Sequence, residues 1–151
     1  MIERERKFEL LHLPVHLTNE PDYIQQGYIT IENDRHVRVR IINQEKAFIT
    51  LKIDISATDR HEYEYVIPLC DGVELFEKAK YRLTKFRHKT RYDGNDVDID
   101  IFINKYKEPF LRVVEIEYQN ELLSLPLYCG RELTGLKEYS NIQIAIDNEK
   151  D

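Results

Sequence analysis

The segment ERERK at residues 3–7 limits the possible folds of this chain more than any other feature. In a strand that packs one face on an apolar core, apolar residues occupy every second position, because successive side chains point to opposite faces. Here both faces carry charge for five residues. A strand at this position must therefore face solvent or a polar interior.

Alternating stretches rich in Ile, Val, Tyr, Phe and Thr recur along the chain and predict strands. Short polar breaks separate most of them, which is typical of turns between antiparallel neighbours. The expected strands are 2–10, 24–32, 36–43, 46–55, 60–68, 82–92, 96–103 and 111–119. Helical spacing at 71–80 and 136–146 predicts two helices packed on the outside of the sheet. The fold class is therefore α+β, mainly β, with an antiparallel sheet.

Length and charge set further limits. A chain of 151 residues fits one domain, residues 1–151. The net charge of −6 and the lack of a long basic run argue against a nucleic-acid-binding surface. We find neither a secretory signal nor an apolar stretch of membrane-spanning length, so we expect a cytoplasmic protein without a membrane partner. Cys70 and Cys129 form no CxxC motif, which predicts two reduced thiols.

Residues of like charge recur two positions apart on most of the expected strands, so each pair lies on one face of its strand. Two carboxylates about 6.7 Å apart repel by roughly 2.5 kcal/mol at an effective dielectric constant near 20. The acidic pairs are Glu3/Glu5, Glu62/Glu64, Asp98/Asp100 and Glu115/Glu117; the basic pairs are Arg38/Arg40 and Lys85/Arg87, with Lys7, Lys52 and Arg60 added singly. The alternation of Asp98 and Asp100 with Val97, Ile99 and Ile101 indicates that the apolar face is the packed one.

Two arrangements would place these pairs: an open sheet with a solvated charged face, or a barrel with the charges inside. Solvated faces usually interleave acids and bases, so segregation by sign favours the barrel, in which opposite charges share one cavity. Carboxylates suit Mg²⁺ or Mn²⁺, and Arg and Lys suit phosphoryl groups. We therefore predict a site for a metal-bound polyphosphate, with Glu3 and Glu5 facing metal, Lys7 facing phosphate, and Arg4 and Arg6 pointing outward.

The segment Glu3–Lys7 resembles the ExExK signature of the CYTH, or triphosphate tunnel metalloenzyme, superfamily. Further motifs follow in that family's order: Gln26–Ile29 resembles QGYL, Val37–Arg40 the RxR strand, Thr50–Lys52 TxK, Arg60–Glu64 RxExE, Lys85–Arg87 KxR, Val97–Phe102 EVDVF with Asp98 in place of Glu, Val114–Glu117 the ExE strand and Tyr139–Asn141 YxN. Lys89/Arg91 is a second KxR candidate. We prefer Lys85/Arg87, which leaves the longer hairpin typical of the family before Asp100. His88 stands where the family often has Tyr.

The resemblance implies an eight-stranded antiparallel closed β-barrel, the triphosphate tunnel, with a few flanking helices. It implies one or two Mg²⁺ or Mn²⁺ ions. The implied metal ligands are Glu3, Glu5, Glu62, Glu64, Asp98, Asp100, Glu115 and Glu117, and the implied phosphate-binding residues are Lys7, Arg38, Arg40, Lys52, Arg60, Lys85 and Arg87. Lys7 or Lys85 would position the attacking water. Tyr28 has two interpretations, a proton acceptor or a packed barrel aromatic.

The expected function is metal-dependent hydrolysis of inorganic triphosphate, or a related small-molecule triphosphate, by direct attack of water. A GxSxG motif and a paired cysteine nucleophile are both missing, so covalent catalysis is disfavoured. One alternative is a class IV-type adenylate cyclase that makes cyclic AMP from ATP, and another is a non-catalytic polyphosphate- or nucleotide-binding module. A thiamine triphosphatase fits less well, because the chain has no Trp and little spare length. We expect a monomer or a homodimer.

Overall fold

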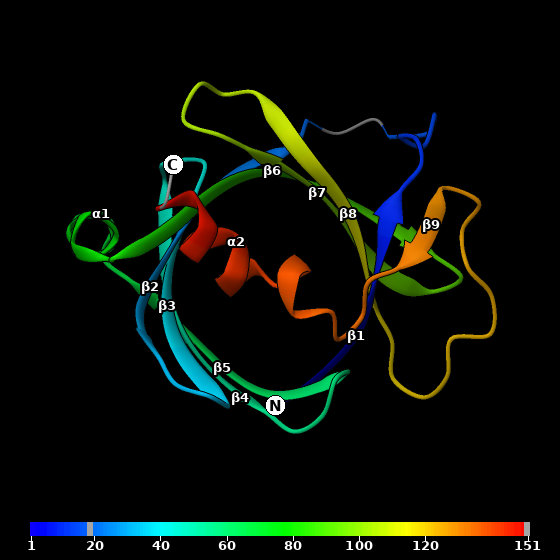
Figure 1. The fold of residues 1–151 in the computed structure, drawn as a ribbon, viewed down its shortest axis with the longest axis horizontal. Coiled ribbons are helices and arrows are strands. Elements are labelled where there is room, and N and C mark those ends of the chain that lie inside the picture. Colours follow the sequence, from blue (N-terminus) through cyan, green and yellow to red (C-terminus); the bar gives the residue numbers. More distant parts are fainter. Residues whose placement is uncertain (18–19, 150–151) are drawn as a thin grey trace.

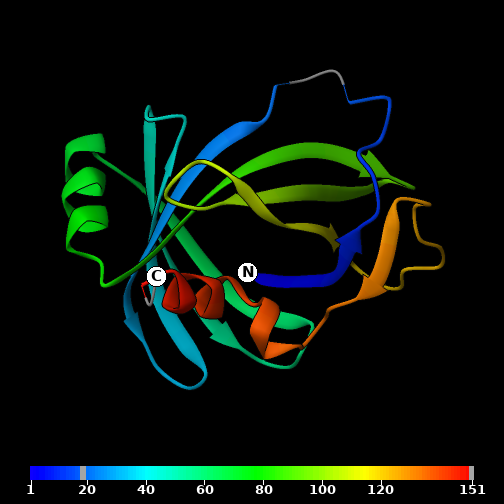
Figure 2. The same ribbon diagram turned by 45° about the horizontal axis from the view of Figure 1, so that its top comes forward.

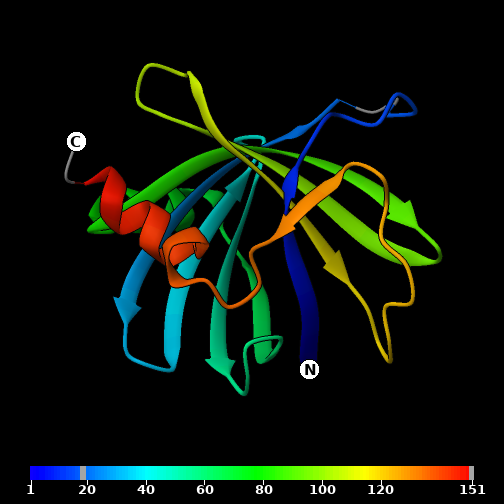
Figure 3. The ribbon, with the colours of Figure 1, turned by 45° about the vertical axis from the view of Figure 1, so that its right-hand side comes forward.

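The computed structural model describes residues 1–17 and 20–149, most of which lie in strands (Figure 1). The strands are β1 (Ile2–Leu10), β2 (Asp22–Ile31), β3 (Arg35–Ile42), β4 (Lys46–Asp54), β5 (Asp59–Ile67), β6 (Tyr81–Tyr92), β7 (Asn95–Ile103), β8 (Pro109–Glu117) and β9 (Cys129–Glu132). The helical elements are α1 (Leu69–Lys78), the 3₁₀ helix η1 (Lys137–Tyr139) and α2 (Asn141–Asn148). All eight expected strands are present. The alternation pattern did not predict the short strand β9, which pairs with β1 (Figure 3).

The sheet closes on itself. Its strand order is β5-β4-β3-β2-β6-β7-β8-β1-β9, and β1 also pairs with β5, so eight strands form a barrel and β9 is an addition to it. Every pairing is antiparallel. The β1–β5 seam is short, with Ile2, Glu3 and Arg4 opposite residues 59–61. The predicted closed antiparallel barrel is confirmed.

One apolar core lies on the outer face of the barrel. Asp98 of β7 and Glu115 of β8 line the cavity, so the alternate residues Val97, Ile99, Val114 and Ile116 point outward, where they pack with Phe8. The segments around Leu17, Leu122 and Tyr128 cover this cluster. The packed apolar faces predicted for these two strands are therefore confirmed. This outside core leaves the barrel interior available for polar side chains.

A second core closes part of the barrel interior and involves α2. Ile144 and Ala145 of this helix pack against Leu83, Phe102 and Val113, whose side chains point inward from β6, β7 and β8. Helix α2 and η1 consequently lie across the opening of the barrel (Figures 1 and 2). The expectation that residues 136–146 form one helix outside the sheet was wrong. The apolar side chains that α2 covers are at one end of the interior, beyond the charged positions of the same strands.

Helix α1 packs outside the barrel against β2, β3 and β4, as expected (Figure 2). Gly72 is its point of closest approach, because a Cβ atom there would lie 2.4 Å from the Cβ of Ala47. Cys70 and Cys129 are free thiols, which agrees with the prediction from their spacing. Among the described residues, no helix combines the length and apolar character that crossing a membrane requires.

The substitution Gly72→Ala tests this close approach. Helix propensity alone would make the change stabilising by about 1 kcal/mol. We expect it instead to lower the free energy of unfolding by about 1–3 kcal/mol, because the added methyl group overlaps Ala47 and must push α1 away from β4. Urea denaturation measures the difference, with Glu74→Ala on the exposed side of α1 as a control. A more stable Gly72→Ala protein would contradict the packing described above.

Candidate active site

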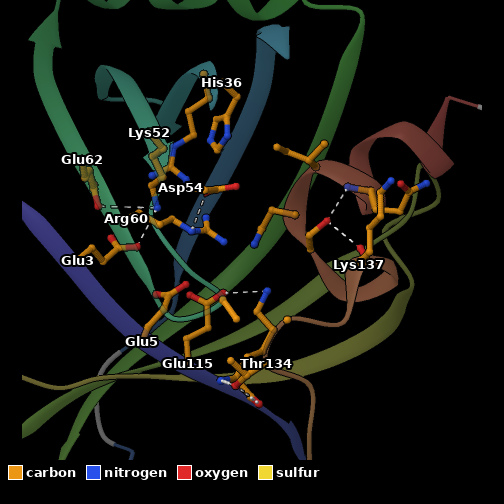
Figure 4. Close-up of a pocket in the computed structure, with 18 of the residues that line it drawn as sticks. Glu3, Glu5, His36, Lys52, Asp54, Arg60, Glu62, Glu115, Thr134 and Lys137 are labelled. Carbon is orange, nitrogen blue, oxygen red and sulfur yellow. Dashed lines mark hydrogen bonds and ion pairs between the residues drawn. The ribbon is translucent and has the colours of Figure 1, made fainter. Parts of the chain in front are cut away.

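A cavity of about 910 Å³ occupies the barrel interior, and its walls carry the predicted site residues (Figure 4). This volume is in the upper part of the range of about 300–1,000 Å³ typical of small-molecule sites. The predicted residues that line it are Glu3, Glu5, Lys7, Tyr28, Arg38, Arg40, Lys52, Arg60, Glu62, Glu64, Lys85, Arg87, Asp98, Glu115 and Glu117. Asp100 is the exception. The charged faces of the strands thus point inward, as the segregation of charge predicted.

The bases form one half of the wall. Lys52 lies on β4, Arg38 and Arg40 on β3, and Lys85 and Arg87 on β6, with β2 between β3 and β6 in the sheet. Three strands within a run of four neighbours in the barrel therefore carry these basic side chains. Of the two candidate KxR pairs, Lys85/Arg87 has both members in the cavity wall. In the pair Lys89/Arg91, only Lys89 lines the cavity, and Arg91 pairs on the surface with Asp96.

The acids form the other half of the wall, on β7, β8, β1 and β5. Glu5 lies directly opposite Glu117 across the β1–β8 ladder, and Asp98 lies opposite Glu115 across β7–β8. Like charges that face each other across a ladder are destabilising. At these two positions, strand pairing therefore brings carboxylates together and adds to their repulsion.

Ion pairs link the two halves (Figure 4). The Nζ of Lys52 donates a hydrogen bond to Oε1 of Glu3 at 3.1 Å and lies 3.8 Å from a carboxylate oxygen of Glu62. Arg38 lies 3.9 Å from Glu64. These contacts compensate part of the negative charge on β1 and β5.

Lys7 and Arg60 are bases located on the acidic half. Lys7 lies 3.7 Å from Glu115, and its Nζ donates a hydrogen bond to the backbone carbonyl of Tyr139 at 3.0 Å. Arg60 lies opposite Glu3 in the β1–β5 seam and 3.5 Å from Asp54. Both side chains therefore neutralise acids locally while remaining in the cavity wall.

Glu5 is an acid of the cavity wall without a compensating partner among the described residues. Its carboxylate forms no hydrogen bond or ion pair with the rest of the described chain, residues 1–17 and 20–149. Burial and the neighbouring Glu115 and Glu3 raise the pKa of Glu5 to about 7. Carboxylate oxygens are preferred ligands of hard divalent cations, so a cation fits this region chemically. In the described part of the chain, however, no three His, Cys, Asp or Glu side chains are already arranged as a metal centre.

Asp100 differs from its predicted role as a metal ligand. It is fully buried behind the cavity wall and accepts hydrogen bonds from Lys85 Nζ at 2.8 Å and from Arg87 Nε and Nη2 at 2.7 and 2.8 Å. Although burial acts in the opposite direction, Arg87 and Lys85 hold the pKa of Asp100 well below its ordinary value. Its oxygens accept hydrogen bonds from the two bases, so Asp100 anchors Lys85 and Arg87 from behind the cavity wall.

Tyr28 has the environment of a packed aromatic residue. It is 2% exposed, belongs to the core around α2, and its hydroxyl accepts a hydrogen bond from Gln26 Nε2 at 2.7 Å. Burial raises the pKa of the phenol, so Tyr28 stays protonated at neutral pH. Of the two interpretations given above, these contacts favour the packed aromatic over the proton acceptor.

Several residues of the site were not predicted. His36 lines the cavity two positions before Arg38, and the alternation of β3 could have revealed it. Burial together with Arg38, Lys52 and Arg60 lowers the pKa of His36 to about 3, so its imidazole is neutral. Asn141 belongs to the YxN motif, to which no role was assigned, and it lines the cavity from α2. No pattern in the sequence places that helix at the barrel opening.

The outward-facing arginines of β1 are where the alternation places them. Arg4 forms a two-point ion pair with Asp59, and Arg6 forms one with Glu132 of β9. These contacts lie on the outer surface of the barrel, with a neighbouring strand in each case. Successive charged residues of the ERERK segment therefore point to opposite faces of β1, as predicted.

Fold and site together define the class: a closed antiparallel barrel with bases on one half of its interior wall and acids on the other. The model of the CYTH domain family matches residues 1–144, and the chain belongs to this family. An inorganic triphosphatase of Acetivibrio thermocellus is 33% identical over 119 residues, which cover 78% of this chain and 76% of that protein.

Solved structures show the same architecture. The inorganic triphosphatase NE1496 superposes with a TM-score of 0.66 at 27% identity, over 95% of this chain and 94% of that one. A putative adenylate cyclase from Bacillus halodurans superposes with a TM-score of 0.54 at 15% identity, over 78% and 81% of the two chains. The second similarity shows a shared fold.

The raised pKa of Glu5 predicts a pH-dependent effect of Glu5→Gln on stability. A carboxyl group with a higher pKa in the folded state binds more protons there, so it lowers stability as the pH rises from about 4.5 to above 7. In metal-free buffer, we expect Glu5→Gln to stabilise the protein at pH 8 by up to about 3 kcal/mol and to have little effect at pH 4. Denaturant titrations at both pH values measure this, with Glu9→Gln as control, because Glu9 lies outside the cavity lining and pairs with the exposed Arg131. Equal effects at both pH values would contradict the charge repulsion inferred for Glu5.

The anchoring role of Asp100 predicts a large loss of stability in Asp100→Asn. Removing one member of a buried, hydrogen-bonded charge network costs about 3–5 kcal/mol, because the remaining charges lose their compensation. Asp96→Asn, which removes the exposed partner of Arg91, is the matched control and should change stability by less than about 1 kcal/mol. Similar unfolding free energies for the two variants would show that Asp100 is not the anchor.

Proposed function

We propose that this protein hydrolyses inorganic triphosphate with the help of a divalent metal ion. The observation that carries the proposal is the division of one enclosed cavity into a basic and an acidic half. A basic half alone would suit any polyanion, whereas the facing carboxylates add a place for the cation that accompanies a polyphosphate. The similarity to two proteins named inorganic triphosphatases supports the same reaction.

The basic half would bind the phosphoryl groups. Arg38, Arg40, Lys52 and Arg87 present their cationic groups from three strands, and Lys85, Lys7 and Arg60 extend this set. Arg side chains can bind phosphate oxygens with two hydrogen bonds at once. Donors already fixed around a partly enclosed cavity also stabilise the charge that develops on the leaving phosphate.

The acidic half would hold Mg²⁺ or Mn²⁺, one ion or two. Glu3, Glu5, Glu115 and Glu117 are its central carboxylates, and Glu62, Glu64 and Asp98 lie beside them on neighbouring strands. When bound, the metal ion neutralises phosphate oxygens and makes bound water more acidic. The carboxylates relieve their mutual repulsion in the same step, because the cation compensates several of them at once.

In this scheme, two lysines would act on the attacking water. Burial and the neighbouring Arg87 lower the pKa of Lys85 to about 7, so its Nζ can either hold or release a proton near neutral pH. Lys7 lies across the cavity wall beside Glu115 and can orient the water by donating a hydrogen bond. Tyr28 keeps its packing role and takes no proton in this scheme.

An assay with tripolyphosphate, ATP and thiamine triphosphate, each with Mg²⁺ or Mn²⁺, tests the proposal. We expect phosphate release from tripolyphosphate, and a loss of at least about 100-fold in kcat/KM for Arg38→Ala, because a donor to developing charge is removed. Arg4→Ala, on the outer face of β1, is the matched control and should retain activity.

Other products would identify the alternatives. Formation of cyclic AMP and pyrophosphate from ATP would indicate a cyclase, and tight saturable binding without any product would indicate a binding module. Full activity of Arg38→Ala would remove the basic half from the mechanism even if tripolyphosphate is hydrolysed.

A further inference from the structure

Both lysines proposed to act on water are held by the same short segment near the end of the chain. Lys7 Nζ donates to the backbone carbonyl of Tyr139 at 3.0 Å, and Lys85 Nζ donates to the side-chain oxygen of Asn141 at 3.0 Å. The segment 139–141 spans the end of η1 and the start of α2. It is therefore in contact with two different strands of the barrel wall through their functional side chains.

The contact with Lys85 is the more specific of the two. Lys85 is fully buried, and its ammonium group has three N–H donors. One donates to Oδ2 of Asp100 at 2.8 Å and a second to Oδ1 of Asn141. With two donors fixed by acceptors on β7 and α2, the direction of the third is determined. A lysine held by Asp100 alone would keep rotational freedom about that single contact.

Asn141 is itself placed by the docking of α2. It is the first residue of the helix, directly after Ser140, whose hydroxyl accepts a hydrogen bond from the Gln143 backbone N–H at 3.1 Å. Ile144 and Ala145 fix the helix in the interior core. The amide of Asn141 therefore projects from a packed and capped element, which gives Lys85 a fixed acceptor.

We propose that Asn141 is a positioning residue that orients the Lys85 amine toward the cavity. The inference rests on the triphosphatase function proposed above, because orientation of Lys85 is useful only if Lys85 acts there. Asn141 does not touch the reacting atoms in this scheme. It acts through Lys85, and it makes the geometry of the site depend on α2 being seated in the barrel opening.

The chain offers a closely matched control for this proposal. Asn148, at the other end of α2, donates a hydrogen bond from Nδ2 to the backbone carbonyl of Arg82 at 3.2 Å. It thus joins the same helix to the same strand, β6, through the same type of side chain. Only Asn141 has Lys85 as its partner. Asn141→Leu and Asn148→Leu therefore both weaken the attachment of α2, but only the first removes an acceptor from the lysine.

The experiment compares steady-state hydrolysis of tripolyphosphate by the wild-type protein, Asn141→Leu and Asn148→Leu. We expect Asn141→Leu to lower kcat about tenfold with KM changed by less than about twofold, and Asn148→Leu to remain within about twofold of the wild type in both constants. Asn141→Ser, which is shorter but suits the start of a helix, serves as a second variant if Asn141→Leu does not fold. Equal losses for the Asn141 and Asn148 variants, or full activity without the Asn141 amide, would overturn the proposal.

A spectroscopic measurement separates this inference from the proposed function. In protein with ¹⁵N-labelled lysine at mildly acidic pH, the Nζ resonance of Lys85 reports its hydrogen bonds whether or not any substrate is hydrolysed. We expect the resonance to shift in Asn141→Leu and to stay unchanged in Asn148→Leu. An unchanged resonance in both variants would overturn the contact itself. A wild-type protein that shows the Asn141-dependent shift but does not hydrolyse tripolyphosphate would instead refute the proposed function.

Discussion

The stability of this structure depends on one requirement: ionised groups that the closed sheet removes from bulk water must be compensated by other groups of the protein. A buried charge is tolerated when an opposite charge and hydrogen bonds replace its hydration. Lys85 and Arg87 meet this requirement through Asp100, and Lys52 meets it through Glu3 and Glu62. Compensation is less complete on the acidic side, where Glu5 has no such partner within the described residues. Three of the bases thus have acidic partners within the protein, whereas Glu5 on the acidic wall is free to bind a cation.

A polar interior requires that the apolar cores lie elsewhere. One core packs on the outer faces of β1, β7 and β8, and the other closes one end of the interior with α2. The strand β7 shows the division within a few residues: Val97 and Ile99 point to the outer core, Asp98 lines the cavity, and Phe102 packs under the helix. Apolar burial therefore holds the barrel together without filling the volume needed for a ligand.

The sequence predicted which face of a strand each side chain occupies. It did not predict how deeply a side chain is buried or which residues distant in the sequence it contacts. Alternation placed Glu3 and Glu5 on the inner side of β1 and Arg4 on the outer side, because the period of a strand is local. The same rule could not separate Asp98, in the cavity wall, from Asp100, behind it, because that difference arises from Lys85 and Arg87 on another strand. The position of α2 was missed for a similar reason: its apolar residues are compatible with either side of a sheet.

The shortness of the β1–β5 seam has a consequence for how the barrel stays shut. This ladder joins only three residue pairs in its register, and its central pair is Glu3 with Arg60, two side chains of the cavity wall. A ligand that binds both side chains also links the edges of β1 and β5 to each other. Because such a ligand binds only the closed barrel, it shifts the equilibrium toward the closed form. Separation of β1 from β5 is then less favourable in the ligand-bound barrel than in the free one.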